Sequence, residues 1–400
     1  MTQATAGPPL YMRRNAFDPT PELREIREGD GVQRIKGAFG LDVYLVTRHD
    51  DVKEALADAG RFSNRRPPEF SPFLGDMTPE EIKRQQAGNL LAMDPPDHHR
   101  LRRMLTPEFT LRRMKRLEPR IVEIVDEHLD ALERAGAPAD LVAEFALPIP
   151  SLVICELLGV PYADRADFQT RTSRQLDFSV PLDERAELQR EGREYMNTLV
   201  TATRKDPGED MLGMLVREHG DDLTQDELVG IANLLLIAGH ETTSNMLGLG
   251  TLALLQHPDQ LAIVRDDPEA VGPAVEELMR WLSVVQSALP RFTPAATELG
   301  GVSIPAESVV ILSMPSANRD PSATDDPDSL DVRRGAPGHL AFGHGVHHCL
   351  GAPLARMEMR IAFPALLRRF PGLALAGDLA DVPYREYSFI YGLQSLEVTW

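Results

Sequence analysis

The sequence predicts a mainly helical fold with small β-sheets, in a single domain that spans residues 1–400. Two stretches, 224–256 and 350–370, are long enough for extended helices, and the second carries apolar residues near helical spacing. Runs rich in β-branched and aromatic residues are short, as in 41–47, and suit small sheets. No Ser/Gly tract, block of like charge or internal repeat divides the chain.

The composition argues against several classes of protein. With 42 Lys+Arg against 61 Asp+Glu, the formal net charge is −19, which disfavours binding to nucleic acid. The chain has no span of about 20 apolar residues, and residues 1–21 have no signal-peptide core. Two cysteines, Cys155 and Cys349, argue against a disulfide framework. We therefore expect a cytoplasmic protein that binds neither nucleic acid nor membrane.

The first elements are predicted from local composition. Residues 41–47 are typical of a strand, and 51–59 of a helix. Residues 61–91 are interpreted as a loop with a short helix at 79–86. Loops of this length in compact domains are more often functional than idle.

A basic helix is predicted to start after Pro95 and Pro96, at Asp97. Within it His98 and Arg102 are four residues apart and share one helix face. Two cationic donors on one face suit a carboxylate. An ordinary solvated basic face is the alternative.

Four cations cluster at residues 112–116, namely Arg112, Arg113, Lys115 and Arg116. A basic cluster on a strongly acidic protein indicates an acidic partner. The alternative is surface charge with little effect. Beyond it, residues 141–160 are apolar and are interpreted as core, with Pro148, Pro150 and Pro161 as breaks. Residues 166–205 are interpreted as two amphipathic helices that break near Val180-Pro181.

The longest predicted helix covers residues 224–256. Thr224 and Glu227 form a capping box at its start, and His257-Pro258 ends it. The helix is therefore ~30 residues and ~45 Å long.

The centre of this helix carries an unusual set of residues, from Ala238 to Thr243. Gly239 costs about 1 kcal/mol relative to alanine in a helix, and the Thr242 hydroxyl can bond the carbonyl of Ala238 and loosen the turn. With the acid Glu241 beside it, such a turn can hold water and pass protons.

This helix has three other interpretations. His240-Glu241 begins a zinc-protease motif, but Ser244 stands where the second histidine is required. Residues 248–253 match a dinucleotide fingerprint, yet no strand precedes them. A kinked helix with a purely structural role remains as the third.

The C-terminal half adds a short helix at 273–282, in which Glu277 and Arg280 can form a bidentate pair. Residues 284–289 are largely apolar and lead to Pro290-Arg291. Residues 297–313 are interpreted as a hairpin, and 396–400 as the last strand.

The segment 342–351 carries the strongest chemical signal. Gly343 and Gly345 permit tight or positive-φ turns, and Cys349 precedes the helix predicted at 350–370. A helix N-terminus favours a thiolate, which suits the axial position of haem iron. A buried structural cysteine and a zinc site with the neighbouring His344, His347 and His348 are the alternatives.

The same segment has a phenylalanine, three glycines, a histidine and a cysteine in the pattern Phe-Gly-x-Gly-x-His-x-Cys-x-Gly. This pattern resembles the haem-binding loop of the cytochrome P-450 superfamily, the haem-thiolate monooxygenases. The family's Ala/Gly-Gly-x-Asp/Glu-Thr-Thr/Ser and Glu-x-x-Arg motifs are matched at residues 238–243 and 277–280. The resemblance implies a triangular helical prism around the haem.

The resemblance also assigns roles to individual residues. It implies that Cys349 ligates the iron of haem b and that Glu241 and Thr242 relay protons to dioxygen. Glu277 and Arg280 would be structural, with Arg333 or Arg334 as a third member of their cluster. The remaining cofactor-binding residues, four of which would neutralise the propionates, are His98, Arg102, Arg291, His347, Ala238, Gly239, Phe342 and Gly351. The residues expected to line the substrate pocket are Leu91, Leu235, Val284, Val285 and Ile390.

By resemblance, the protein is a monooxygenase that uses O₂ to hydroxylate or epoxidise an apolar small molecule. The substrate class would be a secondary metabolite such as a macrolide, another polyketide or a terpenoid. Two cysteines cannot hold an iron–sulfur cluster, so electrons would come from a ferredoxin and its NAD(P)H-dependent reductase, docked on the basic cluster. A peroxygenase driven by H₂O₂ is one alternative, although such relatives lack the acid–alcohol pair. A haem-based sensor without turnover is another.

Overall fold

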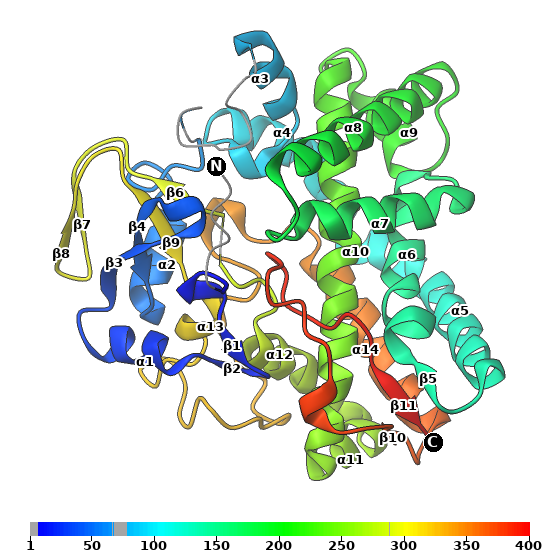
Figure 1. Cartoon of the computed structure of the whole chain (residues 1–400). Helices are drawn as coiled ribbons and strands as arrows, with labels where there is room; N and C mark the ends of the chain where they lie inside the picture. Colours follow the sequence, from blue (N-terminus) through cyan, green and yellow to red (C-terminus); the bar gives the residue numbers. More distant parts are fainter. Residues whose placement is uncertain (1–6, 66, 68–77, 288) are drawn as a thin grey trace. The chain divides into compact units, whose positions relative to one another are not determined.

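The computed structural model describes residues 7–65, 67, 78–287 and 289–400, and it is mainly helical with small sheets, as predicted (Figure 1). The helices are α1 (Pro21–Glu28), α2 (His49–Ala57), α3 (Pro79–Gln86), α4 (Asp97–Leu105), α5 (Leu111–Ala135), α6 (Pro148–Leu158), α7 (Arg165–Leu176), α8 (Leu182–Lys205), α9 (Met211–His219), α10 (Gln225–Gln256), α11 (Pro258–Asp266), α12 (Val271–Leu282), α13 (Met314–Ala317) and α14 (Ala352–Arg369). The strands are β1 (Arg14–Asn15), β2 (Asp18–Pro19), β3 (Val32–Lys36), β4 (Asp42–Val46), β5 (Ala139–Asp140), β6 (Arg291–Phe292), β7 (Thr297–Leu299), β8 (Val302–Ile304), β9 (Val309–Leu312), β10 (Ala374–Leu375) and β11 (Glu397–Thr399).

The chain groups into two compact units, each built from three stretches of sequence. The first unit comprises Met1–Arg65, Leu249–Cys349 and Pro383–Gln394, and the second comprises Arg66–Gly248, Leu350–Val382 and Ser395–Trp400. Helix α10 contributes residues to both.

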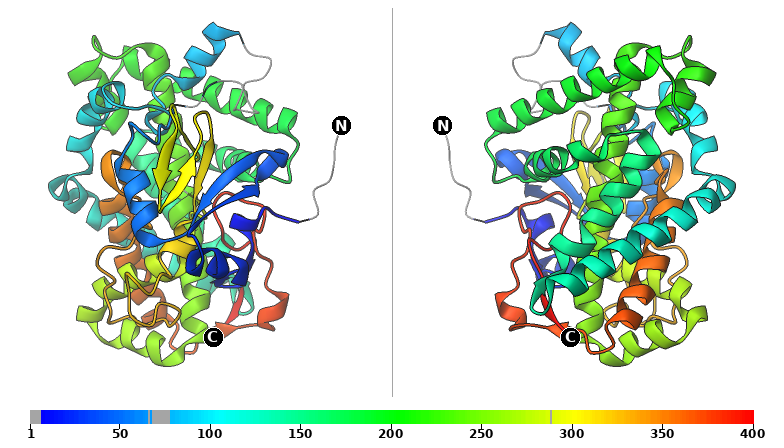
Figure 2. Two further views of the ribbon diagram at one scale, coloured as in Figure 1. Left: turned by 90° about the vertical axis from the view of Figure 1, so that its left-hand side faces the viewer. Right: turned by 90° about the vertical axis from the view of Figure 1, so that its right-hand side faces the viewer.

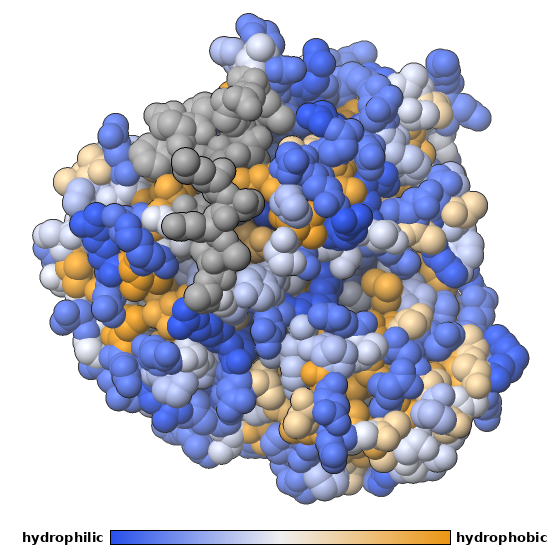
Figure 3. Space-filling model, viewed as in Figure 1, coloured by the Kyte–Doolittle hydropathy of each residue, from blue (hydrophilic) through white to orange (hydrophobic). Residues whose placement is uncertain are grey.

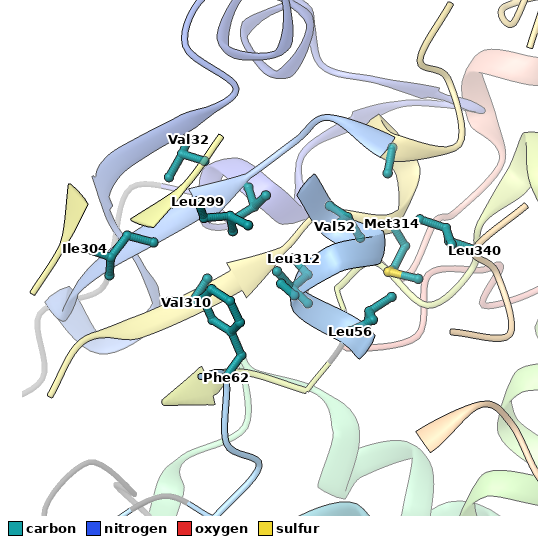
Figure 4. Close-up of a cluster of buried hydrophobic side chains, with 13 residues drawn as sticks. Val32, Val52, Leu56, Phe62, Leu299, Ile304, Val310, Leu312, Met314 and Leu340 are labelled. Carbon is teal, nitrogen blue, oxygen red and sulfur yellow. The ribbon is translucent and has the colours of Figure 1, made fainter. Parts of the chain in front are cut away.

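A four-stranded sheet in the order β3-β4-β9-β6 is the largest sheet of the first unit. Strands β3 and β4 are antiparallel neighbours, and β9 joins β4 in parallel register, with Val43 opposite Val309. Alternating side chains of the sheet meet helix α2 in an apolar core that includes Val52, Leu56 and Leu312 (Figure 4). Burial of these side chains holds sheet and helix together.

The second unit is dominated by helices. Helix α14 packs along α5, α6 also packs against α5, and α7 packs against α8 (Figure 2). A three-stranded antiparallel sheet, β10-β11-β5, uses the C-terminal strand as its centre. The face drawn in Figure 3 carries mostly hydrophilic side chains, in keeping with the charged composition.

Most predicted elements are confirmed. The short helix at 79–86 and the end of α10 at Gln256 lie where the sequence places them, and the capping box is present, with Thr224 N–H donating to Glu227 Oε2 at 2.9 Å and Glu227 N–H donating to Thr224 Oγ1 at 3.2 Å. Part of the loop at 61–91, namely 66 and 68–77, lies outside the described residues. Within the described residues, no helix combines the length and apolar character needed to cross a membrane.

Two local predictions are wrong. Pro148 separates a π-helical turn at Val142–Ala146 from α6, as expected, but Pro150 is not a break: it lies in the first turn of α6, where proline's missing N–H is tolerated. The predicted hairpin at 297–313 ends at Ile304, because residues 309–312 leave it and pair with β4 as β9.

Candidate active site

The loop at 342–349, in the first unit, is closed by a backbone hydrogen bond from Cys349 N–H to Phe342 O at 2.8 Å. Gly343 and Gly345 have φ values of +73° and +70°, which a residue with a side chain rarely adopts. A Cβ atom on Gly345 would lie 2.7 Å from the Leu56 carbonyl oxygen, so this glycine lets the loop pack on α2. The turn ends with the Cys349 side chain exposed. Cysteine is ordinarily among the most buried residues, so the exposure of Cys349 sets it apart from the buried Cys155.

Helix α14 begins at Ala352, with Gly351 as its N-cap, so Cys349 precedes the helix by three residues. The predicted start at 350 is therefore two residues early. A Cβ atom on Gly351 would meet no described atom within 4 Å, and this side of the chain is open. Among the residues that the structure describes, no group of three or more His, Cys, Asp or Glu side chains could hold a metal ion. The zinc alternative thus gains no ligand set from residues 344–349.

Glu277 and Arg280 on α12 form the predicted bidentate pair, with both N–O distances at 2.8 Å and both side chains buried. Arg280 also donates to the carbonyl oxygens of Asn318, Pro327 and Ser329. The pair therefore ties α12 to the irregular segment that precedes the cysteine loop.

The third basic residue of this cluster is Arg334. Its Nε lies 3.3 Å from Glu277 Oε1 and its side chain is 17% exposed. Arg333 instead pairs with Asp267 at 3.0 Å, and its side chain is 58% exposed. The glutamate consequently carries two guanidinium neighbours, Arg280 and Arg334.

In the second unit, one face of α10 is open at the middle of an otherwise buried stretch. Leu234, Ala238 and Thr242 are spaced four residues apart and so share this face; Ala238 is exposed and the other two are half-buried. The Thr242 hydroxyl donates to the Ala238 carbonyl at 3.0 Å, as predicted. The helix nevertheless remains continuous through this turn, so the expected loosening is not seen.

Gly239 has a packing role that the sequence alone does not indicate. A Cβ atom at this position would lie 2.7 Å from Cδ1 and Cγ1 of Ile154 on α6. The glycine therefore allows α6 to approach α10 closely.

The acid of the predicted pair, Glu241, is buried. Its Oε1 accepts a hydrogen bond from the Thr172 hydroxyl of α7 at 3.3 Å and lies 3.5 Å from His240 Nε2. Its backbone carbonyl accepts from Asn245 Nδ2 at 2.7 Å. Acid and alcohol are thus adjacent in the chain, but Glu241 contacts α7 whereas Thr242 lies on the open face.

Arg102, on α4, supplies positive charge to the second unit, and the buried His98 lies one turn before it. Burial, followed by the repulsion of Arg102, lowers the pKa of His98 from 6.5 to about 4. An anion bound beside these two residues would offset the charge of Arg102 and favour the protonated form of His98. In the first unit Arg291 is buried on β6, and His347 belongs to the cysteine loop. Arg102 in the second unit and Arg291 in the first are each suited to pair with a carboxylate.

The apolar residues predicted to line a substrate pocket divide between the units. Val285 and Ile390 form an isolated antiparallel bridge, and Tyr391 N–H donates to the Val284 carbonyl at 2.8 Å, so these residues are neighbours in the first unit. Leu91 and Leu235 belong to the second unit, where Leu235 is buried.

The predicted site residues therefore form two groups. The first unit holds Cys349, Phe342, His347, Arg291, Glu277, Arg280, Val284, Val285 and Ile390. The second holds His98, Arg102, Leu91, Leu235, Ala238, Gly239, Glu241, Thr242 and Gly351.

Reasoning from the sequence did not place three further residues in the candidate site: Leu234, His240 and Thr172. Leu234 lies four residues before Ala238 and eight before Thr242, a spacing that could have placed it on the open face. Thr172 lies in a generic amphipathic helix, and no pattern in the sequence links it to residues 240 and 241.

The comparisons with known proteins all indicate the same family. A family model described as Cytochrome P450 matches residues 39–175 and 182–376. The chain is 52% identical over 397 residues to "Cytochrome P450 FAS1" of Rhodococcoides fascians, covering 99% of both chains. It is 43% identical over 389 residues to "Pentalenic acid synthase" of Streptomyces avermitilis, covering 96% of this chain and 95% of the relative. The solved structure of P450 StaH from glycopeptide antibiotic A47934 biosynthesis is 44% identical, with a TM-score of 0.86, and the match covers 98% of this chain and 100% of that one.

Proposed function

Because the chain belongs to the cytochrome P450 family and is a monooxygenase, we propose that it transfers one oxygen atom of O₂ to an apolar small molecule at a haem b ligated by Cys349. The observation that carries this proposal is the exposed sulfur of Cys349 on a loop shaped by two positive-φ glycines. The loop lies within the part of the chain that the family model matches.

The residues on the page suit a haem chemically. Cys349 would supply the thiolate, and Arg102 and Arg291, with the imidazoles of His98 and His347, would bind the two propionates. When bound, a haem iron with a thiolate ligand activates dioxygen for O–O cleavage. Gly351, whose side is open, leaves room for a flat group beside the chain.

Proton delivery is assigned to Glu241 and Thr242. Thr242 presents its hydroxyl on the open face of α10 while bonded to Ala238 O, so it can donate or accept at that face after a rotation about χ1. Glu241, buried behind this face, can hold one proton and release it. General acid assistance of this kind typically contributes roughly 10²–10⁴-fold to rate.

The substrate class is proposed from the apolar lining and from the relatives. Val284, Val285 and Ile390 offer branched apolar side chains without charge, which favours an apolar ligand. One relative is named as a synthase of pentalenic acid, and one solved structure comes from glycopeptide antibiotic biosynthesis. A secondary metabolite, such as a macrolide, another polyketide or a terpenoid, is therefore the proposed substrate, hydroxylated or epoxidised. The cytoplasmic location remains a prediction.

Electrons are proposed to come from a ferredoxin and its NAD(P)H-dependent reductase. Arg112, Lys115 and Arg116 are exposed in the first turns of α5, and they give an acidic protein a local positive surface. Arg113 contributes less, because it is half-buried and pairs with Glu108 at 3.2 Å.

Reconstitution tests the proposal. Purified haem-loaded protein is screened with small apolar molecules for the low-to-high-spin shift, and each ligand is then supplied with ferredoxin, reductase, NADPH and ¹⁸O₂. The expected product carries one ¹⁸O atom. Ligand binding without product would favour a haem sensor, and product formed only with H₂O₂ would favour a peroxygenase.

A further inference from the structure

Three buried polar side chains meet where α7 lies against α10 (Figures 1 and 2). The Thr172 hydroxyl oxygen is 2.8 Å from His240 Nε2 and 3.3 Å from Glu241 Oε1, and it also lies 2.9 Å from the Phe168 carbonyl oxygen and 3.2 Å from that of Gln169. Thr172 is 4% exposed, His240 is 0% exposed and Glu241 is 2% exposed. A single hydroxyl group thus touches both a base and an acid away from bulk water.

The tautomer of His240 follows from its other nitrogen. Nδ1 lies 2.7 Å from the Leu236 carbonyl oxygen. A carbonyl only accepts hydrogen bonds, so Nδ1 carries a hydrogen. Nε2 is therefore the nitrogen that gains or loses a proton, and it faces Thr172. The edge-to-face contact with Phe168, at 5.2 Å between centroids, holds the ring in this orientation.

The same heavy atoms accommodate two arrangements of one proton. In the first, Nε2–H of an imidazolium donates to Thr172 Oγ1, whose hydrogen is donated to the Glu241 carboxylate. In the second, the protonated Glu241 donates to Oγ1, whose hydrogen is donated to a neutral Nε2. Both arrangements are neutral overall, so the pair avoids a net buried charge. Exchange between them moves two hydrogens and no heavy atom.

We propose that His240 supplies the proton that Glu241 delivers, and that the Thr172 hydroxyl is the bridge through which it passes. This inference rests on the proposed function, which gives Glu241 a proton to deliver. From the first arrangement, Nε2–H passes a hydrogen to Oγ1 as the hydroxyl hydrogen moves to Oε1, so the imidazolium becomes imidazole and the carboxylate becomes the acid. Once Glu241 has given up this proton, a proton taken up from water restores the imidazolium. Thr172 is a positioning residue in this scheme.

The surroundings of the ring leave Glu241 as its charged partner. The described contacts of the imidazole are Thr172, Phe168, the Leu236 carbonyl and Glu241, and the first three carry no charge. The charge of the Glu241 carboxylate therefore decides whether Nε2 carries a hydrogen.

A spectroscopic test needs no turnover. ¹⁵N-histidine-labelled protein is examined as the diamagnetic ferrous carbon monoxide complex at pH 7, in the wild type and in Glu241→Gln. In the wild type the His240 Nε2 resonance is expected toward the value of a hydrogen-bearing nitrogen. In the variant it moves downfield to that of a hydrogen-free nitrogen, because the amide needs no proton and Thr172 then donates to Nε2. An Nε2 resonance that is the same in both proteins overturns the proposal.

His257 is an internal control in the same spectra. Its Nδ1 lies 2.8 Å from the Ala253 carbonyl oxygen, the same local bond as in His240, and its ring packs edge-on against Trp281. Its resonances are expected to be identical in the two proteins.

A second test removes the bridge. Thr172→Val keeps the β-branched shape without the hydroxyl, and Thr172→Ser keeps the hydroxyl. Thr170→Val alters an exposed threonine of the same helix, whose hydroxyl donates to the Ala166 carbonyl. The fraction of NADPH electrons recovered in product is measured for each. We expect it to fall about fivefold in Thr172→Val, the factor that one hydrogen bond is typically worth.

The controls separate this role from a structural one. Thr172→Ser and Thr170→Val are expected to retain the coupling of the wild type, and the spectral binding constant for substrate is expected to be equal in all four proteins. Full coupling in Thr172→Val contradicts the bridge, as does equal loss in Thr172→Ser. Absence of product in the wild type would instead count against the proposed function, and it would leave the ¹⁵N result to decide the proton arrangement.

Discussion

The close approach of Gly239 to Ile154 predicts that the effect of Gly239→Ala on the free energy of unfolding changes sign with the residue at position 154. An added Cβ at 239 would sit 2.7 Å from two side-chain carbons of Ile154, whereas carbon atoms prefer about 3.5–4.0 Å. Overpacking of a core costs about 1–3 kcal/mol. Alanine regains about 1 kcal/mol over glycine inside a helix. Gly239→Ala is therefore expected to lower the free energy of unfolding by about 1 kcal/mol.

The matched background is Ile154→Ala, which removes Cγ1 and Cδ1 and is expected to cost about 2–5 kcal/mol by itself. In this background Gly239→Ala meets no atom closer than the Cβ of residue 154, at 3.2 Å. The substitution then gains the helix propensity and becomes stabilising by about 1 kcal/mol. The interaction free energy of the double-mutant cycle is therefore about 2 kcal/mol.

Chemical denaturation of the four proteins, followed by far-ultraviolet circular dichroism, measures the cycle. An equal effect of Gly239→Ala in both backgrounds would refute the view that close packing of α6 explains the glycine. A stabilising effect in the wild-type background would refute the overpacking itself.

Three further predictions concern charge. Arg334→Ala, which removes a contact to the buried carboxylate of α12, is expected to lower thermal stability, whereas Arg333→Ala, at an exposed pair, changes the free energy of unfolding by under about 1 kcal/mol; equal midpoints in thermal unfolding would contradict this. Burial raises the pKa of the Glu358 carboxyl well above 4.5, so its contribution to stability is complete below that pH and is lost as the pH rises toward the native pKa. Glu358→Gln is expected to be more stable than the wild type near pH 7.5, with a difference that shrinks toward pH 4.5 in urea unfolding; a difference independent of pH would contradict it. The double variant Arg112→Glu, Arg116→Glu is expected to raise KM for ferredoxin roughly tenfold at low salt, with an unchanged spectral binding constant for substrate; an unchanged KM would place the docking surface elsewhere.

Local signals in the sequence predicted much of the fold. The capping box at Thr224 and the stop at His257-Pro258 bounded α10, because both act within one turn of the chain. The Glu277–Arg280 pair was predicted because residues three apart on a helix are neighbours. The choice between Arg333 and Arg334 could not be made, since the path of an irregular segment decides which guanidinium reaches Glu277.

Contacts between segments far apart in the sequence could not be predicted. Pairing of β9 with β4 joins residues far apart in the chain, so the run at 309–312 looked like the second arm of a hairpin. Thr172 contacts His240 because α7 packs on α10, and the sequence pattern of neither helix indicates that contact. The motif at 238–243 indicated an acid and an alcohol, but it did not reveal that their side chains lie on different sides of the helix.

Ligation of iron by the Cys349 sulfur is tested most directly by the spectrum of the ferrous carbon monoxide complex. The wild type and Cys155→Ala are expected to show the red-shifted Soret band of a thiolate-ligated haem. Cys155 is a suitable control because it is buried, and burial raises the pKa of its thiol to about 12. Cys349→Ser is expected to lose the band. A red-shifted band that persists in Cys349→Ser, or its absence from the haem-loaded wild type, would contradict thiolate ligation at this position.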